Sequence, residues 1–112
     1  MTDGSVTQLP VEGVQALLDT GAALIDVREH QETVAGRAAV ARCVPLHAFT
    51  LDSVPEGVPI VLICRSGYRS NVAAAALADL GYTTYNVIGG MQAWQQAGLP
   101  IVTDSGEPGI VL

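Results

Sequence analysis

The spacing of apolar residues changes along the chain, from a helical repeat in some segments to short continuous apolar runs in others. This pattern predicts helices and strands in alternation. Residues 10–19 carry apolar side chains at helical spacing, with Pro10 suited to a first turn and Gly21 to a stop. Residues 23–27 form a short apolar run that predicts a strand. Residues 59–64 predict the clearest strand, because a continuous apolar run of this kind is typical of a strand that is buried on both faces of a parallel sheet.

The rest of the chain continues this alternation. Residues 70–80 predict the clearest helix, with an apolar face made of Val72, Ala73, Ala76, Leu77 and Leu80. The remaining segments give less distinct patterns. They predict one or two helical turns over 30–37, a short strand within 39–46, weak helical turns over 46–54, a strand over 83–88 and a short helix over 89–98. Strands that alternate with helices predict an α/β fold, in which helices flank both faces of a small open parallel β-sheet.

The composition is that of one folded domain, which we expect to span residues 1–112. The chain is 49% apolar and 14% charged, and its length suits a single core. It has no lysine and a net charge of −6, which argues against nucleic acid and anionic membranes as partners. We find neither a signal peptide pattern nor an apolar stretch near the ~20 residues of a transmembrane helix, and therefore expect a cytoplasmic location.

The two cysteines, Cys43 and Cys64, are too few for a disulfide scaffold and lack the spacing of metal ligands, so we expect no metal site. Cys43 is not followed by a segment rich in Arg, Ser and Gly of the kind that follows Cys64, and we expect it to pack in the core. The alternative is that Cys43 reaches Cys64 under oxidation.

The heptapeptide CRSGYRS, residues 64–70, places two of the five basic residues next to a cysteine at the end of the clearest strand. In a parallel sheet, such a strand end leads through a loop into a helix, and a curled loop turns its N–H groups inward to bind an anion. Gly67 supplies the backbone freedom that this loop requires. We expect the loop, Arg65 and Arg69 to hold an anion and to lower the pKa of Cys64, so that a nucleophilic thiolate exists near neutral pH.

At this point the chain resembles the rhodanese family of single-domain sulfurtransferases. The resemblance covers about residues 5–102 and leaves 103–112 as a C-terminal tail. It is carried by IDVREHQET at 25–33, by CRSGYRS as the active-site loop, and by GYTTYNVIGGMQAWQQAGLPIV at 81–102. The chain departs from the family after its second strand, where Gly36, Arg37 and Ala38 replace the frequent Gly-His-Ile. Arg37 either lies on the surface or adds positive potential near the pocket.

The resemblance implies a sheet of about five strands, a reaction without metal or organic cofactor, and a set of site residues. Cys64 is expected to take sulfane sulfur from thiosulfate or a related donor and to carry it as a persulfide. The acceptor is expected to be a thiol, cyanide or another protein. The substrate-binding loop consists of Arg65, Ser66, Gly67, Tyr68, Arg69 and Ser70. Ser70 is alternatively the N-cap of its helix.

Two further residues, Asp26 and Arg28, close a strand at the same edge of the sheet. The resemblance implies that they brace the active-site loop, and an ordinary ion pair at a strand end is the alternative. Near the C-terminus, Met91 and Trp94 lie three positions apart, and we expect them to anchor the last helix in the core.

Two other kinds of function compete with sulfur transfer, namely a cysteine-dependent phosphatase or arsenate reductase and a non-catalytic binding module. Cysteine-dependent phosphatases have the signature C-x-x-x-x-x-R, whereas here Arg69 comes one position sooner and Ser70 stands at the phosphatase position. The shorter loop suits a sulfur atom better than a phosphoryl group, and the chain shows no aspartate loop to act as a general acid. A non-catalytic binding module usually lacks the cysteine or its basic neighbours, and this chain has both.

Overall fold

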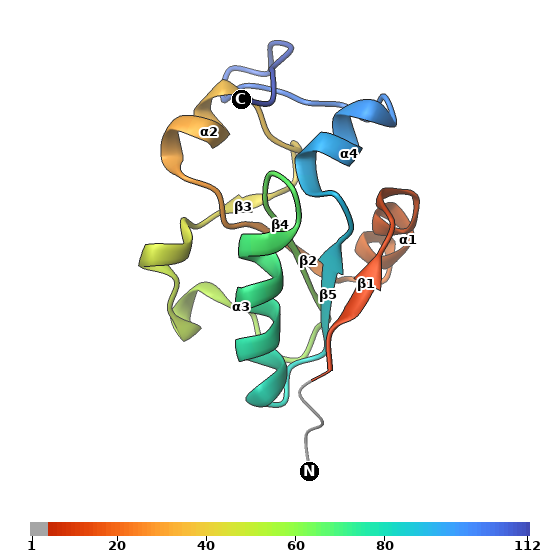
Figure 1. Cartoon of the computed structure of the whole chain (residues 1–112), viewed down its shortest axis with the longest axis vertical. Helices are drawn as coiled ribbons and strands as arrows, with labels where there is room; N and C mark the ends of the chain where they lie inside the picture. Colours follow the sequence, from red (N-terminus) through yellow and green to blue (C-terminus); the bar gives the residue numbers. More distant parts are fainter. Residues whose placement is uncertain (1–4) are drawn as a thin grey trace.

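The computed structural model describes residues 5–112, which form one sheet with helices on both faces (Figure 1). Five strands pair in the order β1-β5-β4-β2-β3, and every neighbouring pair is parallel. The strands are β1 (Thr7–Leu9), β2 (Ala23–Asp26), β3 (Arg42–Cys43), β4 (Ile60–Ile63) and β5 (Thr84–Val87). The predicted α/β fold is therefore confirmed. The pattern of the sequence did not locate β1, because its three residues are mostly polar and exposed.

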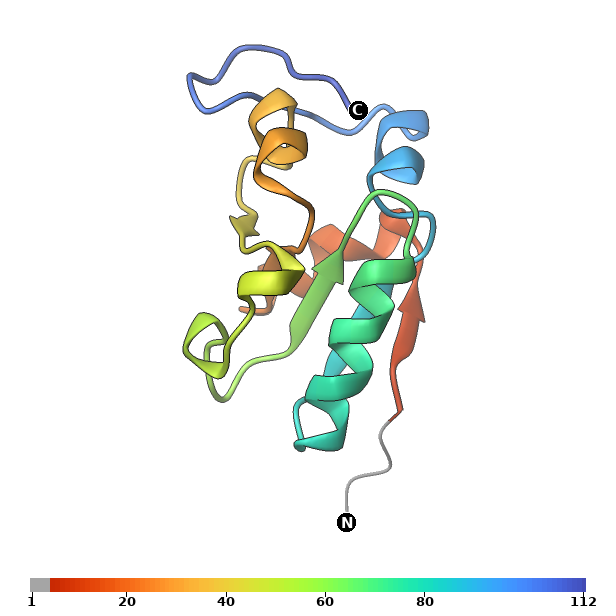
Figure 2. The ribbon, with the colours of Figure 1, turned by 60° about the vertical axis from the view of Figure 1, so that its left-hand side comes forward.

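The helices divide between the two faces of the sheet. They are α1 (Val14–Asp19), α2 (His30–Ala35), α3 (Tyr68–Asp79) and α4 (Gly90–Gln96), with short 3-10 turns at Val11–Gly13, Leu46–Ala48 and Leu51–Ser53. One core cluster joins α1 and α4 to the sheet, and a second joins α3 to its other face. Figure 2 shows α3 in front of the sheet with α1 behind it. No helix within residues 5–112 has the length and apolar character needed to cross a membrane.

Strand β4 is the centre of the molecule, as its apolar run predicts. All four of its residues are fully buried. Ile60 and Leu62 face the core under α3, whereas Val61 and Ile63 face the core under α1 and α4. Because both faces are covered, the strand ends in a rigid setting, and the residue after it has a fixed position at the carboxyl edge of the sheet.

Helix α3 differs from its prediction in its start and in its face. It begins at Tyr68, two residues before the predicted start. The predicted face is wrong in three members, since Ala76 is exposed and Val72 and Leu80 are 48% and 62% exposed, while small side chains such as Ala74 and Ala78 are buried. Alanine lets the helix backbone approach the sheet closely. In a helix this rich in alanine, the apolar pattern alone does not identify the buried face.

The last residues of the chain fold back over α2 rather than trailing away (Figure 1). Val102 forms antiparallel bridges with Arg37 and Pro108, and the Ile110 N–H donates to the Ala35 carbonyl at 2.9 Å. Gly36 lies at the contact, and a Cβ atom there would come within 2.5 Å of the Ile110 carbonyl oxygen.

Candidate active site

The loop after β4 is held by the first turn of α4. The Cys64 carbonyl accepts a hydrogen bond from the Met91 N–H at 2.8 Å, and the Arg65 carbonyl accepts one from the Gln92 N–H at 3.0 Å. These contacts require a very close approach at Gly90, which has φ +55° and where a Cβ atom would lie 2.3 Å from the Cys64 carbonyl oxygen. The carbonyl groups of Cys64 and Arg65 therefore face α4, and the N–H groups of Ser66 and Gly67 turn toward the sulfur.

Gly67 closes the loop and begins the helix. Its φ of +108° lies in the left-handed region, which favours glycine, and it is the N-cap of α3. Its N–H donates to the Cys64 Sγ at 3.1 Å. The helix thus starts four residues after Cys64, which makes the loop shorter than we predicted.

Cys64 is almost completely buried, and the groups around its sulfur are hydrogen-bond donors. The Ser70 hydroxyl lies 3.2 Å from the Sγ atom. Burial raises the pKa of Cys64, but hydrogen bonds from the Ser70 hydroxyl and from the N–H groups of Ser70, Gly67 and Ser66 outweigh burial and hold the pKa below its ordinary value. Ser70 is buried inside the first turn of α3, so its alternative role as N-cap is wrong.

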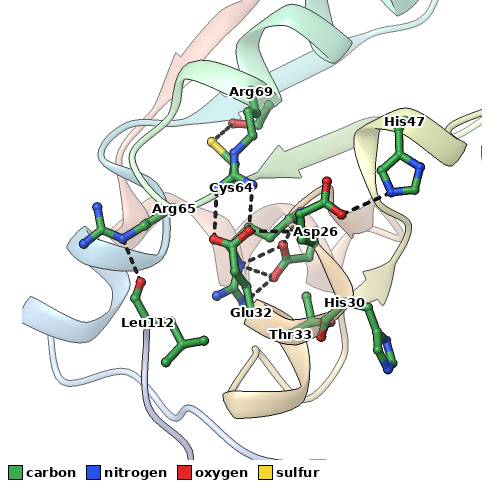
Figure 3. Close-up of polar contacts among 12 residues, drawn as sticks. Asp26, His30, Glu32, Thr33, His47, Cys64, Arg65, Arg69 and Leu112 are labelled. Atoms are coloured by element: carbon green, nitrogen blue, oxygen red, sulfur yellow. Dashed lines mark hydrogen bonds and ion pairs between the residues drawn. The ribbon is translucent and has the colours of Figure 1, made fainter.

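The two arginines of the loop are engaged elsewhere (Figure 3). Arg69 donates two hydrogen bonds to the carboxylate of Glu32, at 2.7 and 2.9 Å, and the Arg65 Nε donates to the Leu112 carbonyl at 2.7 Å. Within residues 5–112, neither guanidinium group has a hydrogen bond to the sulfur. The hydrogen bonds to the sulfur come from the Ser70 hydroxyl and the N–H groups of the loop, and the role of Arg65 and Arg69 in holding a reacting anion stays a prediction.

Glu32 is a site residue that the sequence analysis missed. It belongs to a capping box at the start of α2, in which it accepts from the Glu29 N–H at 2.9 Å. The Arg69 guanidinium lowers the pKa of Glu32, chiefly through its hydrogen bonds. Two glutamates three positions apart at the start of a predicted helix were the available signal. Glu32 connects α2 to the active-site loop.

Asp26 and Arg28 form a fully buried ion pair, with 2.8 Å between Arg28 Nη2 and Asp26 Oδ2. The same nitrogen donates to the Gly36 carbonyl at 2.8 Å. The pair therefore ties the end of β2 to the end of α2, and within residues 5–112 none of the hydrogen bonds of the two side chains reaches the active-site loop. This geometry fits the ion-pair alternative better than direct bracing of the loop.

Asn86 is a second residue that the sequence analysis missed. It lies near the end of β5, is buried, and its Oδ1 is 2.5 Å from the Ser70 Oγ. Its Nδ2 donates to the Gly67 carbonyl at 3.1 Å and to the Gln8 Oε1 at 2.9 Å. An amide side chain inside the predicted strand 83–88 was the signal that could have found it.

Cys43 is exposed on β3, so the prediction that it packs in the core is wrong. In the sheet it pairs with Asp26, which in turn pairs with Ile63, so Cys43 faces the side opposite Cys64. Two strands span about 9.5 Å, beyond the roughly 7 Å that a disulfide permits between Cα atoms. Contact between the two cysteines under oxidation is therefore excluded in the folded protein. Although the side chain reaches solvent, its partial desolvation and the nearby Asp26 charge raise the pKa of Cys43.

The remaining predicted residues lie as follows. Tyr68 is exposed at the first position of α3, and Arg37 forms an ion pair with Asp104 of the C-terminal segment at 3.0 Å. Met91 and Trp94 are buried in the core, as predicted. In the part of the chain that the structure describes, no cluster of three or more His, Cys, Asp or Glu side chains is placed to hold a metal ion.

Comparisons with known proteins find relatives of this chain. A family model described as the rhodanese-like domain matches residues 11–97. A sulfurtransferase of Allochromatium vinosum is 38% identical over 82% of this chain and 90% of its own, and the thiosulfate sulfurtransferase GlpE of Actinobacillus succinogenes is 34% identical over 89% and 94%.

Two solved structures show the same fold. The rhodanese-related protein of Thermoplasma volcanium has a TM-score of 0.79 and 25% identity, over 88% of this chain and 99% of its own. A protein of Rhodopseudomonas palustris, described as a possible tyrosine phosphatase, has a TM-score of 0.74 over 89% of this chain and 87% of its own. At 23% identity, the second likeness concerns the fold alone.

Proposed function

The chain belongs to the rhodanese-like domain family, and from this premise we propose that it transfers sulfane sulfur through a persulfide on Cys64. The observation that carries the proposal is the set of donors around the sulfur, which hold its pKa below the ordinary value although the side chain is buried. A thiolate is the form of cysteine that attacks sulfur. Since the resting structure leaves little room at the sulfur, it favours a small donor such as thiosulfate.

The proposed reaction has two half-reactions. In the first, the Cys64 thiolate attacks the sulfane sulfur of thiosulfate; a new S–S bond forms, the old S–S bond breaks, and its electron pair leaves with sulfite. The negative charge then lies on the terminal sulfur of the persulfide. In the second, cyanide, a thiolate or a protein acceptor takes the terminal sulfur, and the electron pair of the broken bond restores the Cys64 thiolate. Such a scheme gives ping-pong kinetics.

The loop residues have different roles in this proposal. The N–H groups of Ser66 and Gly67 stabilise the negative sulfur in both half-reactions, because hydrogen bonds to a charged acceptor are stronger than neutral ones. Arg65 and Arg69 contribute positive charge near the loop rather than direct contacts. Tyr68, exposed beside the loop, faces the approaching donor or acceptor.

Mass spectrometry after treatment with thiosulfate tests the proposal. We expect the protein to gain the mass of one sulfur atom on Cys64, and the Cys43→Ser variant to gain it equally. The Cys64→Ser variant should stay unmodified and folded, and its steady-state sulfur transfer to cyanide should be lost. Sulfur on Cys43 with none on Cys64 would overturn the assignment of the nucleophile.

The same samples separate the competing functions. A phosphatase would hydrolyse an activated aryl phosphate, and we expect no such hydrolysis above background because the arginine stands one position too soon. A folded protein that neither loads sulfur nor hydrolyses the phosphate would be a binding module. Assays with thiosulfate and with a persulfide donor, each paired with cyanide, thiol and protein acceptors, then identify the preferred substrates.

A further inference from the structure

The Ser70 hydroxyl lies between two groups that can each accept its single proton. Its oxygen is 2.5 Å from the Asn86 Oδ1 and 3.2 Å from the Cys64 Sγ. An amide oxygen carries no proton, so a contact this short requires the hydroxyl to donate to Asn86. The hydroxyl oxygen then presents a lone pair to the sulfur, and in this arrangement it accepts a hydrogen bond from the Cys64 thiol.

The orientation of the Asn86 amide is fixed by its other contacts. Its Nδ2 faces the Gly67 carbonyl at 3.1 Å and the Gln8 Oε1 at 2.9 Å. The carbonyl can only accept a hydrogen bond, so turning the amide would set two oxygens against each other and leave both unsatisfied. The acceptor of Asn86 therefore always points to Ser70.

A thiolate changes this arrangement, because it carries no proton and repels an oxygen lone pair. Ser70 then has to turn its hydroxyl proton from Asn86 to the sulfur, which leaves the buried Asn86 oxygen without a donor. We infer that Asn86 is a positioning residue that competes with the Cys64 sulfur for the Ser70 proton. Asn86 holds the proton while the Sγ atom is neutral, as thiol or persulfide, and gives it up when the atom becomes negative.

This inference rests on the proposed function only in taking Cys64 as the nucleophile, and it assigns no contact between Asn86 and the substrate. The charged groups nearest the loop are Arg65 and Arg69, with Glu32 on α2 and the Asp26–Arg28 pair at the end of β2. None of the hydrogen bonds to the Ser70 hydroxyl comes from these groups. A neutral substitution at position 86 therefore changes the competition for the proton without changing any charge around the sulfur.

Two substitutions of Asn86 give opposite expectations. Asn86→Leu removes the competing acceptor, so the Ser70 hydroxyl donates to the Cys64 sulfur. The pKa of Cys64 is then expected to fall by about one unit. Asn86→Asp keeps the acceptor and adds a negative charge, so the pKa of Cys64 rises. Both variants lose the hydrogen bond to the Gly67 carbonyl, and the added charge of Asn86→Asp raises the pKa under any role, so the fall in Asn86→Leu is the informative result. Asn86→Ala replaces Asn86→Leu if the larger side chain prevents folding.

The measurement is the rate of alkylation of Cys64 by iodoacetamide as a function of pH, in a Cys43→Ser background, with thiolate absorbance as a second readout. Thr84→Val is the matched control, because Thr84 is buried on the same strand and bonds the Ala74 carbonyl instead of Ser70. We expect no change of the Cys64 pKa in this control.

The decisive arm repeats Asn86→Leu in a Ser70→Ala background, where we expect no further change of the Cys64 pKa. An equal fall of the pKa with and without the hydroxyl would overturn the inference, and so would a rise in Asn86→Leu. The titration needs no sulfur transfer. Opposite pKa shifts in a protein that fails to load sulfur would therefore refute the proposed function and leave the inference standing.

Discussion

Replacing the members of the Arg69–Glu32 ion pair tests whether Arg69 braces the active-site loop. The guanidinium and the carboxylate make two contacts, of 2.7 and 2.9 Å, and the side chains are 33% and 14% exposed. Exposed ion pairs contribute about 0.2–1 kcal/mol, and hydrogen bonds to charged groups about 1.5–3 kcal/mol. For a two-pronged pair that is partly screened by solvent, we expect a coupling energy of about 1 kcal/mol, or about 4 °C in Tm.

A double-mutant cycle measures this coupling. The variants are Arg69→Met, Glu32→Gln and both together, and the free energy of unfolding comes from urea titrations. The single tryptophan, Trp94, is buried and donates to the Pro100 carbonyl at 2.8 Å, so its fluorescence reports loss of the core. Each single variant should lose about 1 kcal/mol, and the double variant should lose clearly less than the sum.

The coupling should also depend on pH in a defined direction. The Arg69 hydrogen bonds lower the pKa of Glu32 in the folded protein. The stability from the pair is therefore fully present above the pKa of glutamate in the unfolded chain, about 4.3, and is lost as the pH falls through the lower folded-state pKa. A coupling energy near zero at pH 7, or one that persists in strong acid, would refute the bracing role.

Two further predictions concern glycines at close contacts. Gly90→Ala forces a side chain against the Cys64 carbonyl at a positive φ, so we expect a loss of roughly 1–3 kcal/mol in urea unfolding and slower sulfur loading; unchanged stability would contradict the geometry. Gly36→Ala places its methyl group against Ile110, and we expect faster proteolysis of the last residues with little change in sulfur loading. Equal proteolysis in the variant and the wild type would show that the segment does not need this contact.

Patterns that depend on neighbours in sequence predicted much of this molecule. The apolar run at 59–64 located β4 because a strand covered on both faces has no polar position to interrupt it. The position of Cys64 followed from that strand, since the carboxyl ends of parallel strands meet loops at one edge. The spacing of Met91 and Trp94 likewise identified their buried face.

Features that depend on contacts between distant parts of the chain could not be predicted from the sequence in the same way. The sequence suggests that Arg69 binds an anion, but in the structure its guanidinium donates to the carboxylate of Glu32, 37 positions earlier. Asn86 and Ser70 are 16 positions apart and meet only because β5 lies beside β4. The exposure of Cys43 arose because β3 is a two-residue strand at the edge of the sheet, which local apolarity does not reveal.

The placement of the two cysteines on opposite faces of the sheet has a consequence for oxidation. If peroxide converts the Cys64 thiolate to a sulfenic acid, no second thiol of the same chain can reach it, because Cys43 lies two strands away. Enzymes with a resolving cysteine rescue such a sulfenic acid as a disulfide. Since Cys43 cannot act in this way, rescue as a disulfide has to come from a thiol on another molecule, and without it the sulfenic acid is open to oxidation to the irreversible acids. The time for which the protein stays active in the presence of peroxide should therefore depend on the concentration of free thiols in the solution.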